Sequence, residues 1–116
     1  MLMALEHTKV FIAPQPVDFR KQIDGLSVYV QEVLALDPLS SHLFVFRDRS
    51  GKKIKVLYWH LNGFCLLYKR MPKQRFVWPT AQHSVFCCGV RELQWLLDGS
   101  DIKAMVQRPN LPYTQV

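Results

Sequence analysis

Apolar and polar side chains alternate with a period of two through the middle of the chain. The clearest case is residues 53–59, where one set of alternate positions is apolar and the other mixes cations with large apolar side chains. Successive side chains of a β-strand point to opposite faces of its sheet. We therefore expect the first set in the core, and the second on a face with charge at one end and aromatic surface at the other. The core set is Ile54, Val56 and Tyr58; the second set is Lys53, Lys55, Leu57 and Trp59.

Further runs of β-forming residues flank this segment. We predict strands over 43–46, 54–59, 64–70 and 75–78. The segments between them, RDRSGKK, HLNG and MPKQ, contain glycine, asparagine and proline residues that are typical of turns. Short connections between consecutive strands favour an antiparallel up-and-down meander.

A helical pattern precedes these strands. Asp18 is a candidate N-cap for a helix that runs to about Leu36, because aspartate accepts hydrogen bonds from the first free N–H groups of a helix. The helix must stop near Asp37, because the residue before a proline is disfavoured in the α conformation. Its apolar residues recur at spacings of three and four, which indicates one buried stripe: Ile23, Leu26, Val30, Val33 and Leu34.

The remaining segments are short. Residues 9–13 read as a strand, and residues 79–89 have no clear period and are predicted to be a loop. A short helix is predicted over 90–98, with Gly99 in the position that commonly ends a helix. The tail, 107–116, contains two prolines and is expected to be frayed.

Together these elements predict an α+β fold: an antiparallel β-meander of about four to five strands, packed by one longer N-terminal helix, with a short C-terminal helix. With 116 residues, of which 49% are apolar, the chain allows one core. We expect a single domain over 1–116, with an ordered core over about 9–103. No apolar run reaches the ~18 residues that a membrane-spanning helix needs, and the start lacks the pattern of a secretory signal. The three cysteines fit neither a disulfide framework nor a zinc-ligand spacing, which favours a reduced intracellular protein: Cys65, Cys87 and Cys88.

Positive charge is concentrated in residues 47–75. This segment holds nine cations and one acid, Asp48, and so carries +8, whereas the whole chain carries +6. Cations interleaved with aromatic residues are typical of surfaces that bind nucleic acid; the alternative is an ordinary solvated sheet face. The candidate nucleic-acid-binding residues are Arg20, Lys21, Arg47, Arg49, Lys53, Lys55, Trp59, Lys69, Arg70 and Arg75.

Two of these candidates lie at the predicted start of the first helix. Arg20 and Lys21 could grip a phosphate together with the helix N-terminus, whose free N–H groups favour anions. The alternative is a salt bridge to Asp24 or Glu32. Tyr58, Trp59 and Tyr68 could stack on bases, and the alternative for these rings is a place in the core.

No catalytic or metal site is predicted. An enzyme that cuts and joins DNA strands with metal ions needs converging carboxylates to hold two of them, and the acids of this chain are better explained as cap and turn residues. The histidines show no metal-ligand spacing, and the chain has no phosphate-binding loop or nucleophile motif. We therefore expect no cofactor. These acids and histidines are Asp18, Asp24, Asp37, Asp48, His7, His42, His60 and His83.

Three motifs resemble one protein family. PVDFRKQIDGL at 16–26, LFVFRDRSGKKIKVLYWHLNGFCLLYKR at 43–70 and RFVWP at 75–79 are similar to the small accessory protein, often called TnpB, of insertion-sequence-66-type transposons in bacteria. The resemblance runs from about Val10 to Asp101. The chain departs from the usual family pattern at Phe19, Gln22, Leu39 and His60, and the stretch 79–89 departs most.

The resemblance implies a non-enzymatic role in transposition beside a larger transposase, in the bacterial cytoplasm and at the nucleoid when active. No catalytic residues are implied. The expected partners are transposon DNA, the transposase and the other accessory protein of the element. Two alternatives remain: a module that docks on the transposase without binding DNA, and an RNA-binding regulator of the element.

Overall fold

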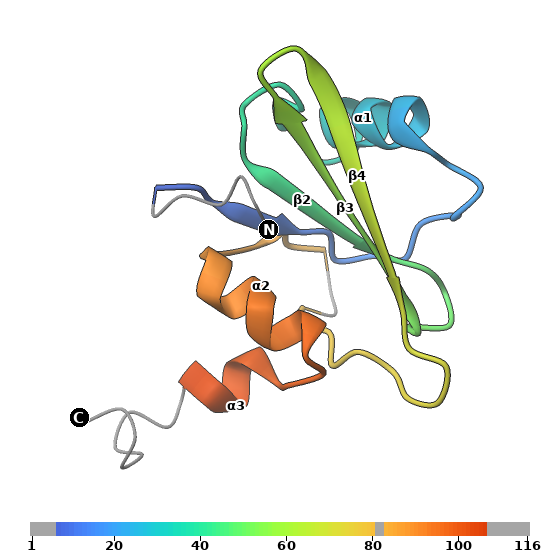
Figure 1. Cartoon of the computed structure of the whole chain (residues 1–116), viewed down its shortest axis with the longest axis vertical. Helices are drawn as coiled ribbons and strands as arrows, with labels where there is room; N and C mark the ends of the chain where they lie inside the picture. Colours follow the sequence, from blue (N-terminus) through green and yellow to red (C-terminus); the bar gives the residue numbers. More distant parts are fainter. Residues whose placement is uncertain (1–6, 81–82, 107–116) are drawn as a thin grey trace.

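The computed structural model describes residues 7–80 and 83–106 and shows an α+β fold around one five-stranded sheet (Figure 1). The strand order across the sheet is β4-β3-β2-β1-β5. In chain order the elements are β1 (Val10–Ile12), α1 (Ile23–Glu32), β2 (Leu43–Arg47), β3 (Lys53–His60), β4 (Gly63–Arg70), β5 (Phe86–Cys88), α2 (Val90–Leu97) and α3 (Ile102–Val106).

The sheet is mixed rather than wholly antiparallel. β2, β3 and β4 form the predicted antiparallel meander. β1, however, pairs in parallel with β2 and antiparallel with β5. Parallel neighbours need a crossover connection, and α1 supplies it between β1 and β2. The prediction of an antiparallel sheet was therefore correct for the meander and wrong for the β1–β2 pair.

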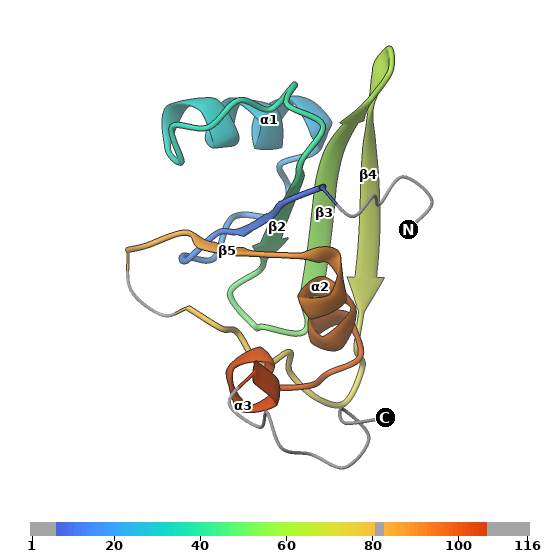
Figure 2. The same ribbon diagram turned by 90° about the vertical axis from the view of Figure 1, so that its left-hand side faces the viewer.

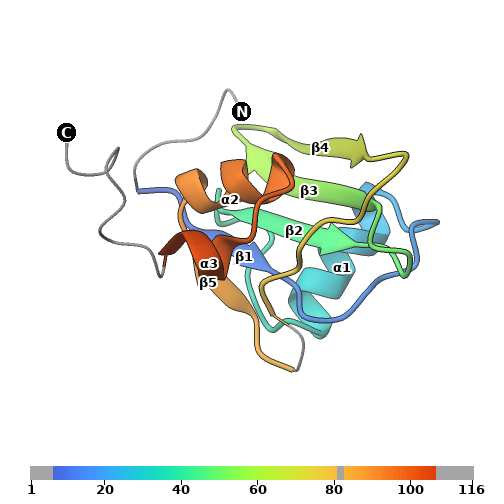
Figure 3. The same ribbon diagram turned by 90° about the horizontal axis from the view of Figure 1, so that it is seen from below.

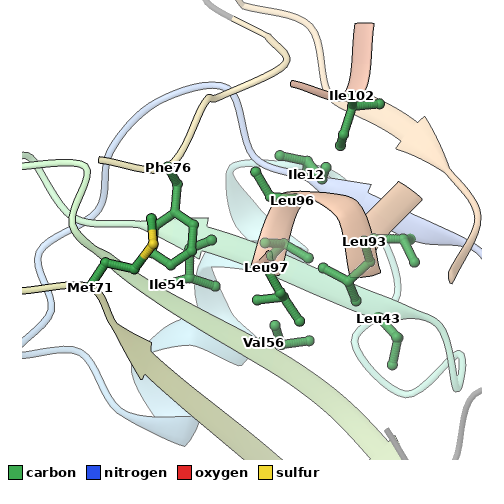
Figure 4. Packing of buried hydrophobic residues seen from close by; sticks show 12 residues of the cluster. Ile12, Leu43, Ile54, Val56, Met71, Phe76, Leu93, Leu96, Leu97 and Ile102 are labelled. Atoms are coloured by element: carbon green, nitrogen blue, oxygen red, sulfur yellow. The ribbon is translucent and has the colours of Figure 1, made fainter. Parts of the chain in front are cut away.

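Helices cover both faces of the sheet. Figure 1 shows α1 behind the upper part of the β3–β4 hairpin and α2 lower in the view, beside the lower part of the sheet. Leu26 and Val30 of α1 pack on the face that carries Phe44, Phe46 and Leu57. On the opposite face, Figure 4 shows the leucines of α2 above the sheet, with Ile102 of α3 beside them. The buried residues labelled there include Ile12, Leu43, Ile54, Val56, Met71, Phe76, Leu93, Leu96, Leu97 and Ile102.

The alternation in β3 correctly placed its core residues. Ile54 and Val56 are fully buried on the α2 face, and Tyr58 packs partly buried beside them. Leu57, from the second set, is also fully buried, under α1. A sheet covered by helices on both faces needs apolar residues on both sides of its central strands. The expected polar face therefore survives only toward the ends of β3.

The longer helix was predicted to be N-terminal, but α1 follows the strand β1. It is also shorter than the pattern suggested. It has ten residues with Gln22 at the N-cap. Asp18 does not cap it; its carboxylate accepts a hydrogen bond from the backbone N–H of Arg20 instead, at 2.9 Å. The helix ends at Glu32, and Ala35 then adopts a positive φ of 56°.

Four further predictions concern the second half of the chain. Residues 75–78 are not a strand, although Phe76 donates a backbone hydrogen bond to Gly51 at 2.8 Å. β5 lies instead within 79–89, where a loop was predicted, and three residues are too few to show a period. The helix predicted over 90–98 is present as α2, whereas α3 was not foreseen. The predicted frayed tail, 107–116, lies outside the described residues.

The described helices are all too short or too polar to cross a membrane. β3 and β4, with eight residues each, are longer than the five-residue β2. Figure 2 shows the turn of this long hairpin at the top, beyond the end of β2. The other end of the hairpin carries the cations.

Candidate nucleic-acid interface

Six cations gather at one end of the sheet, where β2 turns into β3 and β4 ends. Lys53 lies opposite Arg70 in the β3–β4 ladder. The backbone N–H of Met71 donates to the carbonyl of Lys52 at 2.8 Å, which brings the segment after β4 alongside the β2–β3 turn. Figure 3 shows these two connections and the β1–α1 connection at the same end of the sheet. We call this surface the basic end: Arg49, Lys52, Lys53, Arg70, Lys73 and Arg75.

The β2–β3 turn is held by its own acid. The carboxylate of Asp48 accepts hydrogen bonds from the hydroxyl of Ser50, at 2.8 and 2.9 Å, and from the N–H of Gly51, at 3.0 Å. Gly51 has a φ of 76°, a conformation that glycine adopts without steric cost. The side chain of Arg75 lies beside this glycine. The one acid in the cationic segment is therefore committed to the turn.

The basic end has no carboxylate partner among the described residues. The ion pair found within 7–80 and 83–106 joins Arg20 to Asp18, outside the six. Like charges held close together repel one another. They also create a positive potential that attracts and concentrates anions. This end of the sheet therefore carries a concentration of positive charge that can attract anions.

A cleft opens beside the basic end, between the β1–α1 connection and the sheet. Its larger hollow, of about 580 Å³, is lined by Asp18, Arg20, Asp48, Arg49 and Lys53 together with Pro16, Val17 and Phe19. A smaller hollow of about 220 Å³ is lined by Phe19, Gln22, Lys53, Lys55, Leu66 and Tyr68. Phe19 and Lys53 line both hollows, so the two adjoin. We call the pair the cleft.

Arg20 lines the larger hollow and forms an ion pair with Asp18. Its Nε and Nη2 donate to Oδ2 of Asp18 at 2.9 and 2.6 Å, while its side chain remains 91% exposed. The side-chain and backbone hydrogen bonds from Arg20 lower the pKa of Asp18 to about 2. Arg20 therefore pairs with Asp18, and not with Asp24 or Glu32. Because α1 begins at residue 23, Arg20 and the exposed Lys21 precede the helix instead of forming its first turn.

Lys55, one of the candidate nucleic-acid-binding residues, is buried instead of exposed. Its side chain is 3% exposed, and its ammonium donates to the carbonyls of Phe19 and Lys21, both at 2.9 Å. The ammonium also lies 4.8 Å from the centre of the Phe19 ring and 5.9 Å from that of Tyr68. Burial lowers the pKa of this ammonium, and the charge of Lys53 lowers it further. Lys55 therefore fastens the β1–α1 connection to the sheet.

Three other candidates lie away from the cleft. Arg47, which is partly buried, lies over the Trp78 ring at 5.6 Å. Lys69 pairs with Ile54 in the ladder, and its ammonium donates to the carbonyl of Leu97 at the end of α2. Both are therefore on the α2 face. Trp59 is near the turn of the hairpin, remote in register from Lys53, and packs edge-on against Phe64 at 5.0 Å.

The sequence did not point to Phe19 as a site residue. Its ring meets that of Tyr68 edge-on at 6.1 Å, across the gap between the β1–α1 connection and β4. Tyr68 itself is 54% exposed, whereas Tyr58 packs against the α2-face core. Only the tertiary fold brings Phe19 to the sheet, so no local pattern could have identified it. Lys52 and Lys73 were visible in the charge count, although they were not among the candidates.

The cleft presents charged groups and aromatic surface. In the part of the chain that the structure describes, no three histidine, cysteine, aspartate or glutamate side chains gather as a metal site would require. Its carboxylates, Asp18 and Asp48, are each engaged in local hydrogen bonds. The arrangement can bind an anion and contact a flat ring.

Comparisons with known proteins agree with the motifs. Residues 8–107 match the profile of a protein family described as "IS66 Orf2 like protein". The chain is 42% identical over 101 residues to uncharacterized protein y4hO of Sinorhizobium fredii. The matched region covers 87% of this chain and 88% of the relative. It is 29% identical to uncharacterized protein y4jC of the same organism, over 87% of this chain and 86% of that protein. No solved structure matches the chain significantly.

Proposed function

Since the chain belongs to the IS66 Orf2-like family, and is thus an accessory protein associated with an insertion sequence, we propose that it serves transposition by contacting transposon DNA through the basic end. In this proposal the protein is not an enzyme. It neutralises and positions the DNA backbone, and the element's transposase performs the chemistry.

The observation that carries this proposal is the set of six cations without a carboxylate partner in the described residues. A folded protein normally intersperses its charges, because clustered like charges repel. Phosphates would supply the missing negative charge. Contacts to phosphates position a protein without reading sequence, so this surface supports general DNA contact, and sequence selection can belong to the transposase.

The slope of log K against log salt measures how many of the six cations contact phosphates. Each duplex phosphate that a cation neutralises contributes about −0.9 to the slope of log K against log salt. If all six cations met phosphates, the slope would be about −5. A protein that used only two of them would show a slope near −2.

The test is fluorescence anisotropy with a labelled DNA duplex over a salt series. The double variant Lys53→Ala/Arg70→Ala should bind more weakly and lose about two units of slope. Arg91→Ala is the matched control, because Arg91 is an exposed cation on α2, outside the basic end. Absence of binding at low salt to both the duplex and a single-stranded DNA, or equal losses in the double variant and the control, would refute the proposal; docking on the transposase would then replace it.

A further inference from the structure

We propose that the cleft is a binding site for an unpaired nucleotide, so that the protein holds a single-stranded stretch of polynucleotide in preference to a duplex. The inference rests on the proposed function and names the form of nucleic acid that the surface takes. It is drawn from three features of the cleft: its shape, its aromatic wall and the placement of its charges.

The shape of the site is concave. It lies between the β1–α1 connection and the sheet, and its smaller hollow is bounded by Phe19, Tyr68 and Leu66. A duplex is read by an element that projects into a groove, such as a helix or a two-stranded ribbon. A hollow cannot enter a groove, but it can receive a base that leaves the stack. The concavity therefore favours an unpaired strand.

The wall of the smaller hollow is aromatic and accessible. Tyr68 is 54% exposed although it lies at the edge of a packed cluster, and Phe19 meets it edge-on at an interplanar angle of 80°. The two rings and Leu66 form an apolar surface beside charged groups. Stacking on such rings is how proteins hold unpaired bases without regard to sequence. In a duplex the base faces are already covered by their neighbours.

Cations lie where the phosphates on either side of a bound base would pass. Lys53 lines both hollows, and Arg70 lies opposite it in the ladder. Arg20 and Arg49 line the larger hollow. The smaller hollow is lined by two lysines, Lys53 and the buried Lys55, with no carboxylate among its lining residues. One strand could thus place a base against Tyr68 and its phosphates toward Lys53 and the larger hollow.

The experiment compares Tyr68→Leu with Leu67→Ala. Leu67 is the neighbour of Tyr68 in β4, 38% exposed and on the opposite face of the sheet, so its substitution controls for changes in the strand. Thermal unfolding first confirms that both variants fold. Affinities are then measured for an unstructured single-stranded DNA, the same sequence as RNA, and a DNA duplex. Tyr68→Phe, which retains the ring, should behave as the unmodified protein.

We expect Tyr68→Leu to weaken single-strand binding by about 5- to 150-fold, the range for loss of one stacked base, and to change duplex binding by less than about twofold. A 2-aminopurine base in the single strand should be quenched by the unmodified protein and by Tyr68→Phe, but not by Tyr68→Leu. Binding to either single-stranded DNA or single-stranded RNA fits the site. The ratio of the two affinities identifies which of them is the ligand.

Two results would overturn the inference while leaving the proposed function intact. One is equal affinity for single strands and duplex. The other is unchanged single-strand affinity in Tyr68→Leu while Lys53→Ala/Arg70→Ala still weakens binding. Failure of the unmodified protein to bind any of the three nucleic acids would remove both proposals together.

Discussion

Lys53 and Arg70 lie directly opposite each other on β3 and β4, two positive charges on the same face of the sheet. Like charges at directly opposed positions destabilise a strand pair. No described carboxylate forms an ion pair with either residue. The fold therefore tolerates a local electrostatic cost at the surface that we propose meets nucleic acid.

Replacing one of these cations should separate stability from binding. Arg70→Glu turns the repulsive pair into an attractive one and should raise the free energy of unfolding by about 0.2–1 kcal/mol, measured by urea denaturation at low salt. The same substitution should weaken DNA binding. Arg70→Gln, which removes repulsion without adding attraction, should give a smaller gain in stability. A loss of stability in both variants would contradict the repulsion.

Lys55→Met should destabilise the protein. The substitution leaves the carbonyls of Phe19 and Lys21 without the ammonium that they share. We expect the free energy of unfolding to fall by about 2 kcal/mol, since hydrogen bonds to charged groups contribute about 1.5–3 kcal/mol each, and removal of a buried charge offsets part of that loss. Denaturant unfolding measures it. Lys73→Met, at an exposed lysine, is the control; equal stability of the two variants would show that Lys55 does not fasten the connection.

Asp18→Asn should strengthen nucleic-acid binding. The carboxylate of Asp18 engages two nitrogens of the Arg20 guanidinium inside the cleft, and a phosphate would compete with it for that guanidinium. The asparagine oxygen can still accept the backbone hydrogen bond from Arg20, so the turn is kept. The slope of log K against log salt should steepen by about one unit. Asp24→Asn makes the same charge change outside the cleft, and an equal effect there would assign the gain to net charge alone.

The ionisation of Asp18 reports the same contact. With a pKa of about 2, against an ordinary value of 3.8, its carboxylate should stay charged through pH 3 in the folded protein. The contact with Arg20 stabilises the folded protein at pH values above the pKa that Asp18 has in the unfolded chain. This stabilisation is lost as the pH falls through about 2. Carboxyl carbon chemical shifts followed by NMR would measure the pKa. Arg20→Ala should return it toward the ordinary value, and an unchanged titration in that variant would show that another group holds it down.

The adjacent cysteines should differ in reactivity. Burial raises the pKa of the Cys88 thiol to about 12, with contributions from Glu92 and Cys87, whereas Cys87 is exposed. The thiolate is the reactive species, so iodoacetamide at neutral pH should label Cys87 well before Cys88. Peptide mass spectrometry gives both rates in one sample. In Cys87→Ser the slow labelling of Cys88 should persist; comparable rates at the two sites in the unmodified protein would contradict the prediction.

The parts of the fold that were predicted are those with local signals. The β2–β3–β4 meander follows from short turns between alternating strands, and α2 from a leucine pattern that ends before Gly99. The parallel pairing of β1 with β2 and the addition of β5 at the sheet edge join segments far apart in the chain. Such pairings depend on which sheet edge is open once α1 has crossed over, and no local pattern records that.

The sequence by itself determined the concentration of charge between residues 47 and 75 and the face on which each β3 side chain lies, because charge is additive and a strand alternates strictly. The tertiary structure alone decided which cations are accessible. Packing of the β1–α1 connection over β3 buried Lys55, and α2 engaged Lys69 through the carbonyl of Leu97. Lys53 and Arg70 were left side by side at an uncovered end. Accessibility depends on what the rest of the chain covers, and that is a property of three-dimensional packing rather than of any one segment.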